Sequence, residues 1–146
     1  MSAGFFFEPN SSGSSGSAVT PVTFYACGAT GVASGSSPIL FNFVQNDSAN
    51  GYSSTIGRYI VQTTGFYGGF GQFYIGSTST VATANAHLGG TSIAQGSPVT
   101  TASQGSPVSF FRNLTAGQIL DIRPDTSTNI FAGGTLINRF FLYQIV

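Results

Sequence analysis

The chain has 146 residues and a formal net charge of zero, and only 5% of its residues are charged, against about 25% in ordinary soluble domains. Its four basic residues are the scattered arginines 58, 112, 123 and 139. Because phosphate binding needs clustered basic side chains, a nucleic-acid partner is not expected. No apolar run approaches the roughly 18–20 residues that span a bilayer, so membrane insertion is not expected either. A chain of this length suits a single domain.

The scarcity of charge predicts that other chains cover much of the surface. Charged side chains and a net charge away from zero normally keep a small domain from associating; this chain has few charged side chains and no net charge. Phenylalanine and tyrosine make up 14% of the residues, and aromatic side chains are enriched at protein interfaces. We therefore expect an assembly; the alternative is a surface coated with Ser, Thr, Asn, Gln and Gly.

Residues 1–19 are predicted to form an N-terminal arm in front of one domain at residues 20–146. The arm carries an aromatic tip, Phe5, Phe6 and Phe7, followed by a Ser/Gly tract with the composition of a linker. We expect the tip to insert against a neighbouring chain, and the alternative is an arm folded back on its own domain. The N-terminus lacks the positive start and long apolar segment of a secretory signal, which predicts synthesis in the cytoplasm without a signal peptide.

From residue 20 onward the pattern is that of short β-strands separated by Gly, Ser and Pro. Strands are predicted at residues 21–29, 39–45, 57–75 (as two runs), 108–114, 118–123 and 135–146. In the second of these, Ile39, Phe41 and Phe43 are expected on one face. A short repeat at residues 95–99 and 104–108 is interpreted as marking strand starts or edges, because proline has no backbone N–H to donate to a ladder. Short strands without helical periodicity predict an all-β antiparallel sandwich.

The stretch Gly57–Ile75 is the part of the chain on which the other strands are expected to pack. Alternation in its second run separates two sets of aromatic and aliphatic side chains. One set is Phe66, Phe70 and Tyr74, and the other is Tyr67, Phe73 and Ile75. The glycines at 68, 69 and 71 would weaken a helix by about 1 kcal/mol each, whereas in a strand they mark a bulge or the close approach of a backbone or ring.

Candidate catalytic and metal-binding residues are few. His87 is the only histidine and has no histidine or cysteine at ligand spacing, so a zinc site of three or four protein ligands cannot come from one chain. An ordinary loop or half-buried histidine is expected, and the alternative is three copies of His87 on a threefold axis. Cys27 is expected to be an apolar filler, and Asp47 with Asn50 to serve turn chemistry instead of calcium binding. We expect no enzymatic activity, no catalytic residues, no metal and no cofactor.

The four carboxylates, Glu8, Asp47, Asp121 and Asp125, are far apart in sequence, and nothing supports a catalytic pair among them. Asp121 and Arg123 are two residues apart and therefore share one face of a strand. We expect a structural ion pair between them, within the chain or across a subunit boundary, because desolvated charges need partners.

Several short motifs follow one another in a characteristic order. They are FNF (41–43), NGYS (50–53), TIGRY (55–59), TGFY (64–67), LTAGQIL (114–120) and FFL (140–142). This series resembles the trimeric jelly-roll superfamily of complement-component and tumour-necrosis-factor-like proteins, in its bacterial or viral branch. The resemblance implies a two-sheet sandwich of about ten strands that forms a parallel homotrimer around an aromatic axis. Within that trimer we expect Tyr67, Phe73 and Tyr143 at the subunit contact.

These features together predict a non-enzymatic trimeric surface or structural protein of a virion. A capsid decoration (cement) protein or a fibre head of a bacteriophage is the leading hypothesis, with the N-terminal arm docking on capsid, tail or fibre proteins. The alternative is a carbohydrate- or receptor-binding head module of a fibre or cell-surface appendage. In that case Tyr52, Phe66 and Tyr74 are candidate platforms on which a host-surface glycan would stack.

Overall fold

The computed structural model describes residues 20–146 apart from 30, 34–36, 77–80 and 131–136. The arm at residues 1–19, with Phe5, Phe6 and Phe7, lies outside the described residues. In the described part the chain forms twelve strands and no helix, so no helix there could cross a membrane. The prediction of an all-β fold is confirmed.

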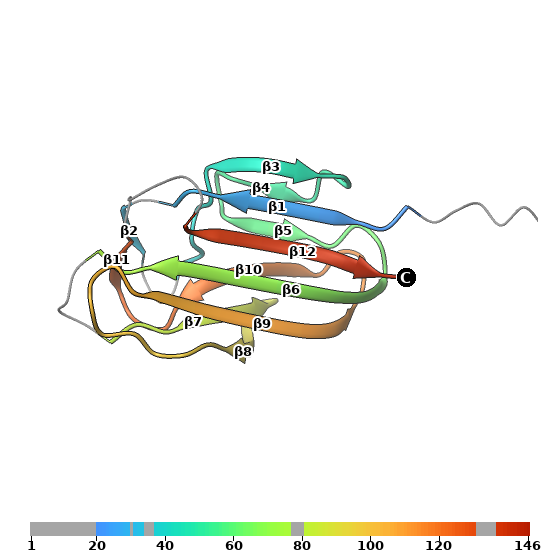
Figure 1. Ribbon diagram of the computed structural model, residues 1–146. Coiled ribbons are helices and arrows are strands. Elements are labelled where there is room, and N and C mark those ends of the chain that lie inside the picture. The colour runs from blue at the N-terminus through green and yellow to red at the C-terminus, as the bar shows by residue number, and fades with distance from the viewer. Residues whose placement is uncertain (1–19, 30, 34–36, 77–80, 131–136) are drawn as a thin grey trace, which may run out of the picture.

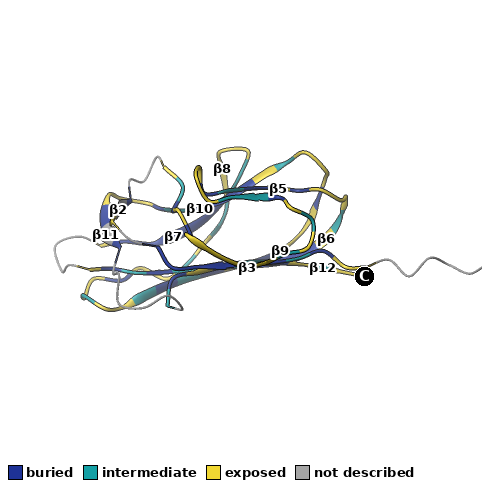
Figure 2. Ribbon diagram, turned by 90° about the horizontal axis from the view of Figure 1, so that it is seen from above, coloured by how far each residue is buried: buried dark blue, intermediate teal, exposed yellow. Residues whose placement is uncertain are grey.

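Two five-stranded sheets lie face to face (Figures 1 and 2). The front sheet has the order β3 (Phe43–Asp47), β1 (Thr23–Cys27), β12 (Arg139–Ile145), β6 (Gly65–Tyr74) and β9 (Gly105–Leu114). The back sheet has the order β4 (Tyr52–Ser53), β5 (Arg58–Ile60), β10 (Ile119–Pro124), β7 (Ala84–Leu88) and β8 (Thr91–Gln95). A small ribbon of β2 (Gly31–Ala33) and β11 (Thr128–Ile130) lies at one end.

All strand pairs described by the structure are antiparallel. Strands that follow each other in sequence often belong to different sheets, as β5 and β6 do, and likewise β9 and β10. The two crossings are hydrogen-bonded to each other, because Val61 N donates to Gln118 O and Gly117 N donates to Val61 O. This order of two sheets joined by crossing connections is a jelly-roll sandwich, as predicted.

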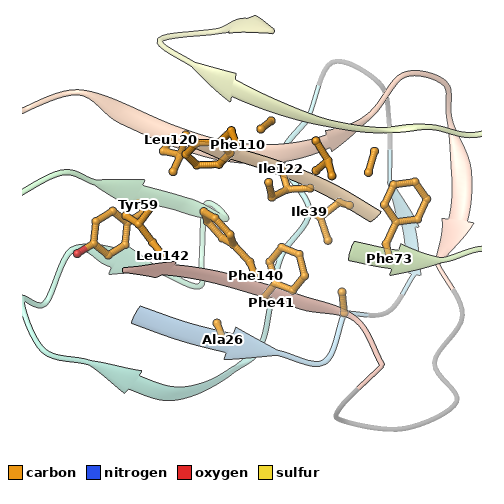
Figure 3. Packing of buried hydrophobic residues seen from close by; sticks show 14 of the residues in the cluster. Ala26, Ile39, Phe41, Tyr59, Phe73, Phe110, Leu120, Ile122, Phe140 and Leu142 are labelled. Carbon is orange, nitrogen blue, oxygen red and sulfur yellow. The ribbon is translucent and has the colours of Figure 1, made fainter. Parts of the chain in front are cut away.

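The core is the aromatic and aliphatic layer between the two sheets (Figure 3). Phe24 from β1 and Phe140 from β12 meet edge to face with ring centroids 5.0 Å apart, the geometry that aromatic rings prefer. Tyr59 and Leu120 close the layer from the back sheet, where they face each other in register. Aromatic rings from both sheets therefore pack together with aliphatic side chains to hold the sheets together.

The predicted strand at residues 39–45 is correct only in its second half. β3 begins at Phe43, and residues 39–42 instead cross between the sheets, with Ile39 N bonded to Ile122 O and Asn42 N to Gly28 O. Ile39 and Phe41 are buried, whereas Phe43 is exposed. The prediction that all three share one face is wrong, because the crossing segment turns its side chains into the core before the ladder begins.

The glycines of β6 make room for side chains of neighbouring strands, as predicted. A Cβ on Gly69 would overlap the ring of Phe110, and one on Gly68 would overlap the ring of Tyr143. The first ring lies inside the sandwich and the second lies on its outer surface. The glycines thus allow rings to lie directly on the backbone on both sides of the sheet.

Candidate functional site

The outward face of the front sheet carries a dense group of aromatic side chains. Strand register places them on four adjacent strands and the edge strand β3. We call this group the aromatic face: Tyr25, Phe43, Phe66, Phe70, Tyr74, Phe111, Phe141, Tyr143 and Ile145. Phe111 is 63% exposed and Tyr143 is 37% exposed, so large apolar side chains face solvent in one continuous layer.

Ring contacts order the centre of the aromatic face. Phe70 and Phe141 stack with centroids 5.0 Å apart and planes 18° from parallel. Tyr143 continues the row, 6.4 Å from Phe141, and lies over Gly68. Aromatic pairs of this kind contribute about 0.5–1.5 kcal/mol beyond their buried area. The surface is therefore pre-arranged and suits a flat apolar partner.

Charge is nearly absent from the aromatic face. Arg139 is the one charged residue at an outward register position of the front sheet among the described residues. Cores of protein interfaces are depleted in charge because burying an unpaired charge is costly. The aromatic face has the composition of such a core.

The outward face of the back sheet differs, because it carries a cluster of three charged residues. Arg123 holds Asp121 through two hydrogen bonds, Nε to Oδ1 at 2.6 Å and Nη2 to Oδ2 at 2.9 Å. Arg58 approaches the same carboxylate from β5, with Nε 3.5 Å from Oδ2. Asp121 is only 1% exposed. The predicted ion pair of Asp121 and Arg123 therefore forms within the chain, and Arg58 leaves the cluster with one excess positive charge.

The hydrogen bonds to Asp121 raise the pKa of Arg123 above its usual value, and burial opposes this rise. The bidentate geometry satisfies both carboxylate oxygens, which is the strong form of an arginine–carboxylate pair. Arg58 Nε is buried and has no hydrogen-bond partner among the described residues. Asp121 therefore pairs mainly with Arg123, and the positive charge of Arg58 is only partly neutralised by the same carboxylate.

A pocket of about 380 Å³ opens beside Arg58. We call it the Arg58 pocket. Its lining comes from β2, β11, the crossing segment and the loop before β5, and consists of Ala33, Ser37, Pro38, Ile39, Leu40, Thr55, Ile56, Arg58 and Ile130. A smaller hollow on the other side of Arg58 is lined by the charged cluster and the Gly89–Gly90 turn. Among the described residues, the lining of the Arg58 pocket combines apolar walls with one cation and contains no carboxylate.

Comparisons with known proteins bear on the fold. No protein-family model matches the sequence, and no curated protein sequence matches it. Solved structures do match: Eiger TNF from S. frugiperda at a TM-score of 0.71 and 15% identity, over 87% of this chain and 94% of that chain. Murine APRIL at pH 8.0 matches at a TM-score of 0.70 and 8% identity, over 86% of this chain and 100% of that chain.

Pika GITRL matches at a TM-score of 0.53 and 14% identity, over 86% of this chain and 96% of that chain. The chain has the fold of a tumour-necrosis-factor-like jelly roll. Identities this low establish the fold and leave the function open. The resemblance read from the short motifs is thus confirmed for the jelly roll.

Within this tumour-necrosis-factor-like jelly roll, two of the three residues that were expected at the subunit contact have side chains that face the core. Tyr67 and Phe73 are fully buried between the sheets, and the hydroxyl of Tyr67 donates to Thr63 O within the chain. The prediction that Tyr67 and Phe73 lie at the subunit contact is therefore wrong, because both side chains fill the core of a single copy. Tyr143 does lie on the aromatic face. Phe66, Phe70 and Phe111 are the outward residues that sequence reasoning did not place at the contact.

The three candidate stacking platforms are not gathered into one site. Tyr52 packs inside against Phe24, with centroids 4.8 Å apart, and its hydroxyl donates to Phe41 O. Phe66 and Tyr74 lie eight register positions apart along β6, on the aromatic face. Tyr52 is therefore a half-buried residue packed against the core, and the other two belong to the surface already described.

His87 lies in β7, not in a loop, and its Nδ1 is 3.1 Å from Gly90 O. Among the described residues, no group of three or more His, Cys, Asp or Glu side chains is placed to hold a metal ion. Asp47 accepts hydrogen bonds from Gly51 N and Tyr52 N, which is the turn chemistry predicted for it. Cys27 is buried, as expected for a filler.

Proposed function

We propose that this protein is a non-enzymatic homotrimer in which the aromatic face lies between the copies. The aromatic face is the observation that carries the proposal. Soluble monomers rarely expose contiguous apolar patches beyond a few hundred Å², and here several rings on adjacent strands face outward together. The motif resemblance implies a parallel trimer around an aromatic axis, and this face is the surface that would line it.

The proposal also fits the distribution of charge. Burying the aromatic face removes mostly apolar atoms from water and desolvates one charged residue per copy, Arg139. The charged cluster of the back sheet stays at the periphery of such a trimer. His87 is on the back sheet too, so three copies of His87 would not meet at the axis, and this disfavours a threefold zinc site.

For the biological role we propose a structural protein at the surface of a virion, as a capsid decoration protein or fibre head. Its few charges, its jelly-roll fold and the aromatic-tipped arm predicted from the sequence support this role. The arm docks on the larger assembly while the trimer covers its own aromatic face. A receptor- or glycan-binding head is the alternative, and it retains only Phe66 and Tyr74 of its three platforms.

The molar mass in solution tests the trimer. Light scattering on residues 20–146 should give three times the mass of one copy. Phe111→Arg should lower that mass, because a charge would enter the contact without a partner. Val81→Arg is the matched control, since Val81 is also half-exposed but lies outside the aromatic face. A monomeric mass for the unmodified domain at micromolar concentration would remove the proposal.

The role is tested on particles. Mass spectrometry of purified virions should find the chain in a fixed ratio to the major capsid or fibre protein. Deletion of residues 2–19 should abolish attachment and leave the domain trimeric. If the chain occurs only free in solution, or binds glycans on an array without any particle, the head-module alternative is favoured.

A further inference from the structure

The Arg58 pocket has a chemistry that one segment of this same chain matches. We propose that the arm tip of a neighbouring copy, Phe5 to Glu8, docks in the Arg58 pocket, with phenylalanine rings on its apolar walls and the Glu8 carboxylate on Arg58. The inference rests on the proposed trimer and gives the arm a partner in addition to the larger assembly, namely the Arg58 pocket of a neighbouring copy.

The walls of the pocket suit aromatic rings. Proline, isoleucine and leucine side chains supply most of the lining, and Leu40 and Ile56 are about half exposed at its mouth. An apolar cavity of about 150 Å³ holds a benzene ring, and the Arg58 pocket has about 380 Å³. The volume therefore accepts at least one ring of the tip together with the side chain that follows it.

Charge complementarity selects Glu8. Three of the four carboxylates in the chain already have partners: Asp121 binds Arg123, Asp47 binds two backbone amides, and Asp125 accepts from Thr83 N. Glu8 is the fourth, and it directly follows three phenylalanines. Arg58 is the cation at the pocket, and its side chain is 39% exposed. A carboxylate arriving there would balance the excess charge of the cluster.

The geometry of the chain favours a neighbouring copy over the same one. β1 begins at the end of the sandwich that also holds the C-terminus, whereas β2 and β11 lie at the opposite end (Figure 1). The pocket is lined by residues of β2 and β11, so it lies at the end of the sandwich opposite to the start of β1. Residues 9–19 span at most about 40 Å when extended, so the tip can reach beyond its own copy.

A peptide of residues 2–9, acetylated and amidated to remove terminal charges, tests the docking. Fluorescence anisotropy would follow its binding to the domain of residues 20–146. Glu8→Gln in the peptide and Arg58→Gln in the domain should each weaken binding at least about tenfold. Combined, they should weaken it no further than either alone, because both remove the same contact.

Two further variants keep the test sharp. Ile56→Asp places a carboxylate at the half-exposed mouth of the pocket and should also repel the tip, without touching Asp121. Arg112→Gln is the matched control: Arg112 is an exposed arginine of β9 away from the pocket, and its loss should leave binding unchanged. Absence of binding, or binding that Glu8→Gln and Arg58→Gln do not weaken, overturns the inference.

Light scattering of the full chain distinguishes a neighbouring copy from the same one. Docking between trimers should raise the mass above that of residues 20–146 as the concentration increases, and Glu8→Gln should reverse the rise. Equal masses for all three proteins would mean that the arm does not link copies, and would overturn this part. Failure of the peptide to bind while the arm deletion still abolishes particle attachment would reject the inference and leave the proposed function standing.

Discussion

Two neighbouring glycines of β6 differ in what lies above them. Gly69 is under the buried ring of Phe110, whereas Gly68 is under the partly exposed ring of Tyr143. A buried ring cannot move aside, so Gly69→Ala should lower the free energy of unfolding by about 1–3 kcal/mol. When both substitutions are made in the Phe111→Arg background, where the copies should not associate, Tyr143 can swing into solvent, and Gly68→Ala should change stability by about 0.5 kcal/mol or less. Urea denaturation of the domain measures both, and equal losses would contradict this reasoning.

Two tyrosines, Tyr59 in the core and the half-buried Tyr52 packed against it, differ in their hydroxyl partners. Tyr52 Oη accepts from Phe41 N at 3.0 Å and donates to Phe41 O, whereas Tyr59 Oη has no hydrogen-bond partner among the described residues. Tyr52→Phe should therefore lower the free energy of unfolding at pH 7 by about 1 kcal/mol. Tyr59→Phe should leave stability unchanged or raise it, because it removes a buried hydroxyl that gains nothing from the fold.

The same two hydroxyls make the fold sensitive to alkali. Burial raises the pKa of Tyr52 to about 12, and burial, followed by the charge of Asp47, raises the pKa of Tyr59 further above its usual value. The unfolded chain releases these protons near pH 10 while the folded chain keeps them. Stability is therefore complete below about pH 10 and falls as the pH rises toward 12. Tyr59→Phe should flatten this decline in thermal melts, and an unchanged slope would contradict the assignment.

Asn138 ties three strands of the front sheet together just before β12. It is fully buried; its Oδ1 accepts from Tyr74 N at 2.8 Å, and its Nδ2 donates to Ala29 O at 2.9 Å. Its own carbonyl accepts from Gly28 N. Asn138→Ala would leave the amide at 74 and the carbonyl at 29 without their side-chain partner. The free energy of unfolding should fall by at least about 2 kcal/mol.

Chemical denaturation would check this, with Asn113→Ala as the control, because Asn113 is an exposed residue of β9. A loss of unfolding free energy no larger than that of the control would mean that the hydrogen bonds of Asn138 do not stabilise the strand ends. The hydrogen bonds of Asn138 were not predictable from the sequence, where Asn138 is one polar residue among many. Its side-chain amide gains two backbone partners only because the ends of β1, β6 and β12 meet in the fold.

Strand periodicity explains both the success and the error at the element scale. Alternation in β6 correctly separated Phe66, Phe70 and Tyr74 from Tyr67, Phe73 and Ile75. Both sets are equally apolar, so the sequence contains no local sign of which set faces the second sheet. That choice depends on contacts with β10 and β7, which are distant in sequence. The prediction for Tyr67 and Phe73 was therefore right about the strand and wrong about which face of the strand points to the second sheet.

At the scale of the whole molecule, some parts of the fold can be predicted from local sequence patterns and others cannot. Turn residues and short apolar runs were sufficient for the sandwich, and the motif order for the jelly roll. Partner strands were not predictable, because β5 and β6 are adjacent in sequence yet lie in different sheets. The Arg58 pocket was not predictable for the same reason, since residues from β2, the crossing segment, β5 and β11 meet there only after both sheets form.

Association should be visible in the stability of the whole molecule. If three copies bury the aromatic face, unfolding releases three chains, and two association steps are lost for each trimer. Each tenfold rise in protein concentration should then raise the free energy of unfolding by about 2.7 kcal/mol per trimer. Differential scanning calorimetry across a hundredfold concentration range would measure this as a rising Tm.

Phe111→Arg supplies the contrast for that measurement. It should remove the concentration dependence while leaving the far-ultraviolet β-sheet signal intact, because Phe111 contributes to the outer surface and not to the layer between the sheets. Val81→Arg should keep the dependence of the unmodified chain. A Tm independent of concentration in the unmodified protein would mean that each copy is stable with its aromatic face in water, and the aromatic face would then need a partner other than this chain.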